Sequence, residues 1–131
     1  MILLDTHVWL WWLSNPEKLS DEATAAIQRA QQESSIVISS ISTWEAAFLV
    51  HKGRLQLSID IRDLVRKTEG LPFVRFIPVD NTISLRSMSL PGDFSPDPAD
   101  RIIAATALTM GIPLISKDAN ILKSKHVQTI W

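Results

Sequence analysis

The chain has 131 residues, with 46% hydrophobic and 21% charged residues, no cysteine and a formal net charge of −1. These values are typical of one soluble globular domain, so we expect a single domain over residues 1–131. The lack of cysteine excludes disulfides and thiolate metal sites, and the net charge excludes a polybasic nucleic-acid coat. The apolar run 8–13 is far shorter than the ~20 residues of a membrane span, so we expect a cytoplasmic protein without membrane contact.

Short apolar runs and helix-capping signals alternate along the first part of the chain. Residues 2–4 are predicted as a buried strand, and Asp5 or Thr6 is placed to cap a helix that ends before Pro16. Ser20 is predicted to cap the next helix, whose alanine and isoleucine side chains recur at helical spacing. The chain therefore begins with a strand followed by two helices.

A second strand and a capping motif come next. Residues 36–38 are predicted as another buried strand. The spacing of Ser42 and Glu45 matches the S-x-x-E capping box, so we expect a helix that begins there, runs to about His51 and ends at Gly53. In this interpretation Glu45 is a helix-capping residue as well as a candidate functional acid.

The middle of the chain continues the alternation of helices and strands. One helix is expected to begin at Ser58 and to close at Gly70. Residues 73–79 then alternate as in a third strand or an edge strand. Asp80 is predicted to cap a short helix that runs through Leu90.

Two aspartates three residues apart open an otherwise apolar helix. Asp97 is placed as its N-cap, Pro98 suits the first helical position, and Asp100 falls at the third, near the positive end of the helix dipole. Residues 102–110 are almost entirely apolar, and Gly111 marks the end. We therefore expect this helix to lie in the core with only its acidic start reaching solvent.

The last predicted elements are two short strands. Residues 114–116 form a strand that delivers Lys117 and Asp118, and residues 127–131 form the final strand. Short strands that are apolar on both faces and alternate with helices predict a parallel sheet between two helix layers, that is, a three-layer α/β/α sandwich. In such sheets the functional groups gather at the carboxyl ends of the strands.

Acidic residues lie close to the ends of several predicted strands and at helix starts. They are Asp5, Glu45, Asp97, Asp100 and Asp118, and most of them have an ordinary alternative as a helix cap or turn residue. Together, however, they are expected to converge on one edge of the sheet, where their repulsion requires a cation. Oxygen ligands without cysteine favour Mg²⁺ or Mn²⁺, which bind phosphate esters and activate a water for phosphoryl displacement.

In order and spacing, four segments resemble the PIN domain, and more narrowly the VapC-type toxins of bacterial toxin–antitoxin pairs. The segments are Leu4-Asp5-Thr6-His7-Val8, Ser42-Thr43-Trp44-Glu45, residues 97–107 and Ile115-Ser116-Lys117-Asp118. The resemblance covers essentially the whole chain. One departure is the stretch 92–96, where relatives often carry basic or histidine residues.

The resemblance implies an Mg²⁺- or Mn²⁺-dependent endoribonuclease with a three-layer fold, which forms a homodimer and is inhibited by a small cognate antitoxin of the VapB type. Carried over by position, the expected catalytic quartet is Asp5, Glu45, Asp100 and Asp118, with Asp5, Asp100 and Asp118 as metal ligands. Asp97 is then an accessory acid, and the Thr6 hydroxyl is expected to hold Asp5 or a water on the metal.

Two cations and several aromatic residues have open interpretations. Arg101 either binds a phosphate or pairs with a neighbouring acid, the second being favoured, and Lys117 is the other candidate for substrate binding. His7 is either a proton carrier or an ordinary packed histidine. The tryptophans within 9–12 and Phe48 exceed what a small core needs, which favours a partner or dimer interface, although core packing explains most of them.

Two other functions stand as alternatives. A phosphatase-type phosphoryl hydrolase needs an Asp-x-Asp-x-Thr motif or an acid pair at the first strand, and Asp5-Thr6-His7-Val8 offers neither. A catalytically inert PIN-like binding module would use the same acids only as helix caps. Such a module would not respond to Mn²⁺.

Overall fold

A five-stranded parallel sheet forms the centre of the fold in the computed structural model, which describes residues 1–92 and 94–131. The strand order is β3-β2-β1-β4-β5, and every neighbouring pair is parallel. The strands are β1 (Ile2–Leu4), β2 (Ile36–Ser39), β3 (Val74–Ile77), β4 (Leu114–Ile115) and β5 (Thr129–Ile130). β1 lies between β2 and β4, so its carboxyl end is central. Asp93, in the stretch that departs from the family pattern, lies outside the described residues.

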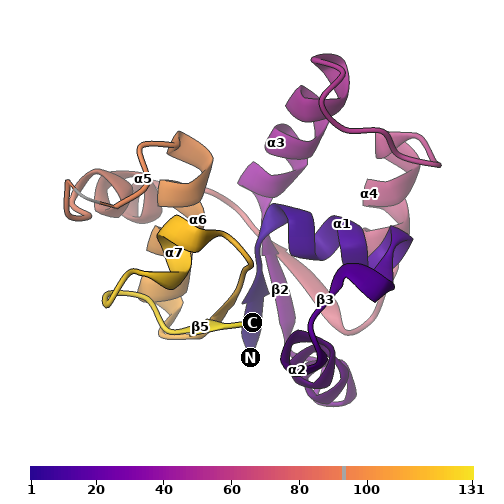
Figure 1. Cartoon of the computed structure of the whole chain (residues 1–131), viewed down its shortest axis with the longest axis horizontal. Coiled ribbons are helices and arrows are strands. Elements are labelled where there is room, and N and C mark those ends of the chain that lie inside the picture. Colours follow the sequence, from indigo (N-terminus) through magenta and orange to yellow (C-terminus); the bar gives the residue numbers. More distant parts are fainter. Residues whose placement is uncertain (93) are drawn as a thin grey trace.

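Helices cover both faces of this sheet (Figure 1). They are α1 (Thr6–Ser14), α2 (Asp21–Gln32), α3 (Ser40–His51), α4 (Ile61–Glu69), α5 (Asn81–Met88), α6 (Pro98–Met110) and α7 (Ala119–Leu122), with a short 3₁₀ turn, η1, at Pro16–Lys18. In Figure 1, α1, α2 and α4 lie on one side of the sheet and α5, α6 and α7 on the other. This arrangement confirms the predicted three-layer α/β/α sandwich. None of the helices in the described part of the chain is long and apolar enough to cross a membrane.

Two of the three inner strands, β1 and β2, bury apolar side chains on both faces, because successive side chains of a strand point to opposite sides of the sheet. In β1, Leu4 packs into the core that α1, α2 and α4 share, whereas Leu3 packs into the core formed with α6. In β2, Ile36 and Ile38 join the first core and Val37 joins the second. A sheet that is apolar on both faces needs helices over each face, so these strand sequences require the three layers.

A buried hydrogen bond fixes α1 against α4. The indole Nε1 of Trp9 donates to Oγ1 of Thr68 at 3.1 Å, and the Thr68 hydroxyl donates to the carbonyl of Leu64 at 2.8 Å. Trp9 and Thr68 are both fully buried. Because α1 begins directly after Asp5, this contact also fixes the direction in which the end of β1 presents its aspartate.

The third helix begins earlier than its capping motif predicts. α3 follows β2 without a loop, and Ser39 is its N-cap, accepting a hydrogen bond from the Ile41 amide at 3.2 Å. Ser42 is therefore buried in the first turn, and Glu45 lies in the second turn. The capping-box assignment is wrong, and Glu45 has no capping role.

Smaller differences concern other helix ends. α4 has Asp60 rather than Ser58 as its N-cap, because the Asp60 carboxylate accepts a hydrogen bond from the backbone amide two residues further on. Asp118 caps a complete short helix, α7, where only a turn or cap was expected. α6 reaches solvent at Thr109 as well as at its acidic start. The predicted N-caps Ser20, Asp80 and Asp97 and the helix stop at Gly111 are confirmed.

Replacing Thr68 by Val should lower the free energy of unfolding by about 1–3 kcal/mol, because the buried indole N–H of Trp9 then loses its acceptor. Thr82→Val makes the same change on an exposed part of α5 and should stay within about 0.5 kcal/mol of the unaltered chain. Urea unfolding followed by circular dichroism measures both differences. Equal stability of the two variants would contradict the role given to this hydrogen bond.

Candidate active site

The five acidic residues singled out in the sequence line one pocket of about 530 Å³. Asp5 follows β1, Asp118 lies just after β4, Glu45 comes from α3, and Asp97 and Asp100 open α6. Neighbouring parallel strands end at the same edge of a sheet, so acids far apart in the sequence become neighbours there. The other lining residues are His7, Trp11, Leu49 and Lys117.

Asp5 is the most buried acid of the pocket, with 7% of its surface exposed. Its Oδ1 accepts a hydrogen bond from the Thr6 amide at 2.8 Å, and its Oδ2 accepts one from the Ser116 hydroxyl at 2.7 Å. Burial raises the pKa of Asp5 above its ordinary value, although both hydrogen bonds act in the opposite direction. The carboxylate is therefore fixed in place and is costly to ionise.

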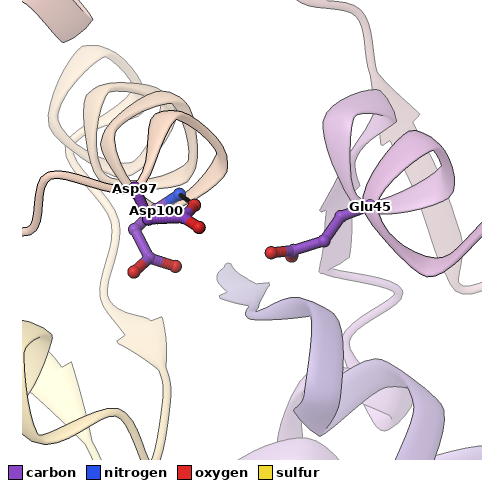
Figure 2. Close-up of side chains that lie close together, drawn as sticks. All are labelled: Glu45, Asp97 and Asp100. Carbon is purple, nitrogen blue, oxygen red and sulfur yellow. Dashed lines mark hydrogen bonds between the residues drawn. The ribbon is translucent and has the colours of Figure 1, made fainter. Parts of the chain in front are cut away.

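Glu45, Asp97 and Asp100 form a close acidic group, in which one carboxylate oxygen of each residue lies within 4.8 Å of the others. Figure 2 shows Glu45 extending from α3 toward the two aspartates at the start of α6. Oδ1 of Asp97 accepts a hydrogen bond from the Asp100 amide at 3.0 Å, which is the predicted N-cap contact. Asp97, expected as an accessory acid, is thus a full member of this group.

Burial and mutual repulsion raise the pKa values of two of these acids. The pKa of Asp100 is raised from 3.8 to about 7, first by burial and then by the negative charges of its aspartate neighbours. The pKa of Glu45 is also raised, by burial first and then by the charges of Asp5 and Asp97. At neutral pH the pocket therefore attracts protons or a cation more strongly than isolated carboxylates do.

Ser116 lies in one of the four motif segments but had no predicted role, and it joins two of the acids. The Ser116 hydroxyl, which donates to Asp5, accepts a hydrogen bond from the Asp118 amide at 3.1 Å. Ser116 is fully buried, and Asp118 in turn caps α7. One hydroxyl therefore couples the end of β1 to the end of β4.

Ser95 makes the same arrangement at the start of α6. Its hydroxyl donates to Oδ2 of Asp100 at 2.8 Å and accepts from the Asp97 amide at 3.2 Å. The signal common to both serines is the pattern Ser-x-Asp directly before a helix. The same pattern occurs at Ser58, away from the pocket, so it identifies a site residue only in combination with the acids that converge there.

Thr6 is fully buried next to Asp5. Its amide donates to the Asp5 carboxylate, whereas its hydroxyl donates to the Ser42 hydroxyl at 2.9 Å. Ser42 precedes Glu45 by three residues on α3, so the pair of hydroxyls positions the part of α3 that carries Glu45. The contact expected between Asp5 and the Thr6 hydroxyl is made by the main chain instead.

The two cations considered for substrate binding are placed differently. Arg101 donates to the backbone carbonyls of Ser87, Leu90 and Ser95, at 3.0–3.3 Å, and within residues 1–92 and 94–131 it forms no salt bridge with an acid. Its guanidinium thereby ties the segment before α6 to the helix. Lys117 is exposed and lines the pocket, with Nζ 5.7 Å from the centre of the Trp11 ring. Lys117 is therefore the cation that faces the acids.

The donor set fits a hard divalent cation. Five carboxylates line the pocket, and within residues 1–92 and 94–131 none of them forms a salt bridge. Uncompensated charges in a half-buried site are costly, and oxygen ligands in a chain without cysteine suit Mg²⁺ or Mn²⁺ better than softer metals. The oxygens of Glu45, Asp97 and Asp100 are within reach of one shared ion, and Asp5 and Asp118 lie in the same pocket.

Comparison of the sequence with models of known protein families identifies the family to which this fold and this pocket belong. The model of the PIN domain family matches residues 2–126, a range that includes all five acids of the pocket. The chain therefore belongs to the PIN domain family, as the four motif segments predicted.

Among individual proteins, the chain is similar to Ribonuclease VapC22 of Mycobacterium tuberculosis, with 33% identity that covers 99% of this chain and 98% of that protein. VapBC2 from Rickettsia felis, bound to a DNA fragment from its promoter, has a TM-score of 0.72, 16% identity and coverage of 98% of this chain and 97% of that chain. A toxin–antitoxin complex from Klebsiella pneumoniae has a TM-score of 0.64 and 21% identity, and the match covers 97% of this chain and 95% of that chain. At these identities the two solved structures establish the fold alone.

Replacing Asp100 by Asn should stabilise the metal-free protein at pH 8, because the ionised carboxylate is half-buried beside other negative charges. The folded-state pKa of about 7 lies above the ordinary value of 3.8, so the folded state binds this proton more tightly than the unfolded state. The destabilisation is therefore complete above pH 7, decreases as the pH falls and is absent below about pH 4. Thermal unfolding in EDTA measures it.

The expected advantage of Asp100→Asn at pH 8 is about 1 kcal/mol, after allowance for the solvent that screens this carboxylate. Asp63→Asn is the matched control, since Asp63 has 66% of its side chain exposed on α4, outside the acidic pocket, and this variant should not be stabilised at pH 8. An advantage of Asp100→Asn that grows on acidification would contradict the assigned pKa shift.

Proposed function

We propose that this chain is a metal-dependent endoribonuclease that hydrolyses RNA phosphodiester bonds. The observation that carries the proposal is the gathering of five carboxylates in one pocket, with no salt-bridge partner for any of them in the described residues. Helix capping alone would not require these acids to meet. The relative VapC22 is named a ribonuclease, which supports RNA as the substrate.

We assign the catalytic quartet to Asp5, Glu45, Asp100 and Asp118, with Asp97 as an accessory acid. Asp5, Asp100 and Asp118 are the proposed ligands of Mg²⁺ or Mn²⁺, and Glu45 and Asp97 reach the same space. Such a cation, when bound, makes a water more acidic and offsets the negative charge of the phosphate oxygens.

The chain's own side chains then have distinct parts in the reaction. Ser116 holds Asp5 in position and Ser95 holds Asp100, each by donating a hydroxyl hydrogen bond to Oδ2. Glu45, whose pKa is raised by burial, is placed to accept a proton from the attacking water. Lys117 at the edge of the pocket is placed to pair with a phosphate oxygen of the RNA.

The purified chain should cleave single-stranded RNA only when Mg²⁺ or Mn²⁺ is present, and EDTA should abolish cleavage. Asp5→Asn should reduce cleavage to background, because the amide fills the same space between Thr6 and Ser116 but has no charge to hold a cation. Labelled oligonucleotides separated on gels measure the rates. Asp63→Asn removes an exposed carboxylate on α4, outside the pocket, and should cleave at the normal rate.

Two results would contradict this proposal. Cleavage that persists in EDTA would exclude the metal-dependent mechanism. Absence of cleavage together with no thermal shift on addition of Mn²⁺ would favour the catalytically inert binding module.

We further propose that the chain is the toxin of a toxin–antitoxin pair, with a small cognate antitoxin of the VapB type. The protein from Klebsiella pneumoniae with the same fold was solved as a toxin–antitoxin complex. On α3, Trp44 and Phe48 stack with ring centroids 5.2 Å apart while 57% and 38% of their surfaces are exposed. Leu49, next to Phe48, lines the acidic pocket, so an antitoxin bound to this aromatic stack would lie beside the pocket.

Trp9 was also a candidate for a partner or dimer interface, but its side chain is part of the core.

A homodimer is the proposed assembly of the toxin itself. Leu85 and Met88 on α5 are 72% and 77% exposed, and they are the apolar side chains that a second copy would cover. Both belong to α5, which lies on the opposite side of the sheet from α1, α2 and α4 (Figure 1).

Expression of the chain in a bacterial host should arrest growth, and co-expression of the cognate antitoxin from the neighbouring gene should restore growth.

Trp44→Ser should weaken the toxin–antitoxin complex about tenfold or more, because a large exposed aromatic contact is lost. Titration calorimetry measures the affinity. Ile59→Ser changes an apolar residue that is 40% exposed outside the stack and should bind normally. Growth arrest that no neighbouring gene neutralises would contradict the pairing.

A further inference from the structure

The acidic pocket is larger than a metal site alone requires. Its volume of about 530 Å³ lies in the range of about 300–1,000 Å³ that is usual for small-molecule sites. Its acids come from the ends of β1 and β4, from α3 and from the start of α6. The remaining lining includes His7, Trp11 and Leu49, to which the proposed metal chemistry gives no part.

The helix that follows Asp5 contributes two aromatic rings to this lining. His7 and Trp11 are four residues apart on α1, so their side chains lie on one face of the helix. Their ring centroids are 5.8 Å apart and the ring planes are inclined by 51°. Val8 and Trp9 are buried in the core on the sheet side of α1. α1 therefore packs one face against the sheet and presents the other to the pocket.

Neighbouring side chains hold the Trp11 ring in place, and the ring still lines the pocket. Its ring lies 6.0 Å from that of Trp131, and it is only partly buried. The ammonium groups of Lys18 and Lys117 lie 5.8 and 5.7 Å from its centre. Cations at this distance are attracted to the face of an indole ring. The result is a fixed aromatic ring close to the acids, with two exposed lysines over it whose ammonium groups a stacking base would displace.

An aromatic face together with a nearby cation is the combination by which proteins bind single-stranded nucleic acid, since bases stack on rings and phosphates pair with ammonium groups. We propose that His7, Trp11 and Leu49 form a subsite for the base of the nucleotide that flanks the cleaved phosphate, with Lys117 pairing with a phosphate oxygen. This inference rests on the proposed ribonuclease function and deepens it, because it names the contact that positions the scissile bond.

The test asks whether Trp11 and one base take part in the same contact. A short single-stranded RNA that the unaltered chain cleaves is prepared with an abasic nucleotide on one side of the cleaved bond, and then on the other. For the unaltered chain, loss of the contacted base should lower kcat/KM about tenfold or more. Trp11→Leu should cleave the intact RNA with a similar loss, and removal of the same base should then change its kcat/KM by less than about twofold.

Two further variants separate this contact from general damage to the protein. Trp11→Phe keeps an aromatic face and should retain most of the effect of base removal. Trp12→Leu makes the same change at the next position of α1, where the ring packs 6.1 Å from that of Phe73 and outside the acidic pocket. Trp12→Leu should therefore show the full effect of base removal.

The outcomes distinguish the subsite from the function on which it rests. An equal effect of base removal in Trp11→Leu and the unaltered chain would overturn the subsite and leave the ribonuclease intact. Normal RNA cleavage by Trp11→Leu with weakened antitoxin binding would assign the rings to the protein partner and also overturn it. Failure of the unaltered chain to cleave any RNA with Mn²⁺ would overturn the proposed function and the subsite with it.

Discussion

The burial of negative charge at one edge of a parallel sheet is the constraint on which this structure depends. Asp5 is almost completely buried, and burial raises its pKa and those of Glu45 and Asp100. Among the described residues no cation pairs with these acids, and Lys117 at the edge of the pocket lies over an indole ring instead. The folded chain therefore carries an electrostatic cost that a bound divalent cation would offset.

The rest of the fold keeps these acids in position despite their repulsion. β1 lies in the middle of the sheet and ends at Asp5, and the bond between Trp9 and Thr68 holds the helix that follows it. Ser116 connects that aspartate to the turn after β4, and Ser95 makes the equivalent contact at the start of α6. The carboxylates of Asp5 and Asp100 are thus fixed by short hydrogen bonds from neighbouring residues.

The pocket combines two chemical surfaces that the alternation of strands and helices brings together. The strand ends and the start of α6 supply carboxylates, whereas the outward face of α1 supplies His7 and Trp11. A cation held by the first surface would bind a phosphate, and the second surface is the subsite proposed for a base. The proposed substrate, a phosphodiester with its attached nucleoside, would contact both surfaces.

The sequence by itself determined the strands, most helix starts and the identity of the acids, because strand hydrophobicity, N-caps such as Asp97 and family motifs are local signals. It misplaced the start of α3, since Ser39 and Ser42 are both good caps and only the direct passage from β2 into the helix selects Ser39. The partners of the acids were decided by the tertiary structure. Ser116 is 111 residues from the Asp5 that it holds, and such a contact depends on strand order, which no local pattern specifies.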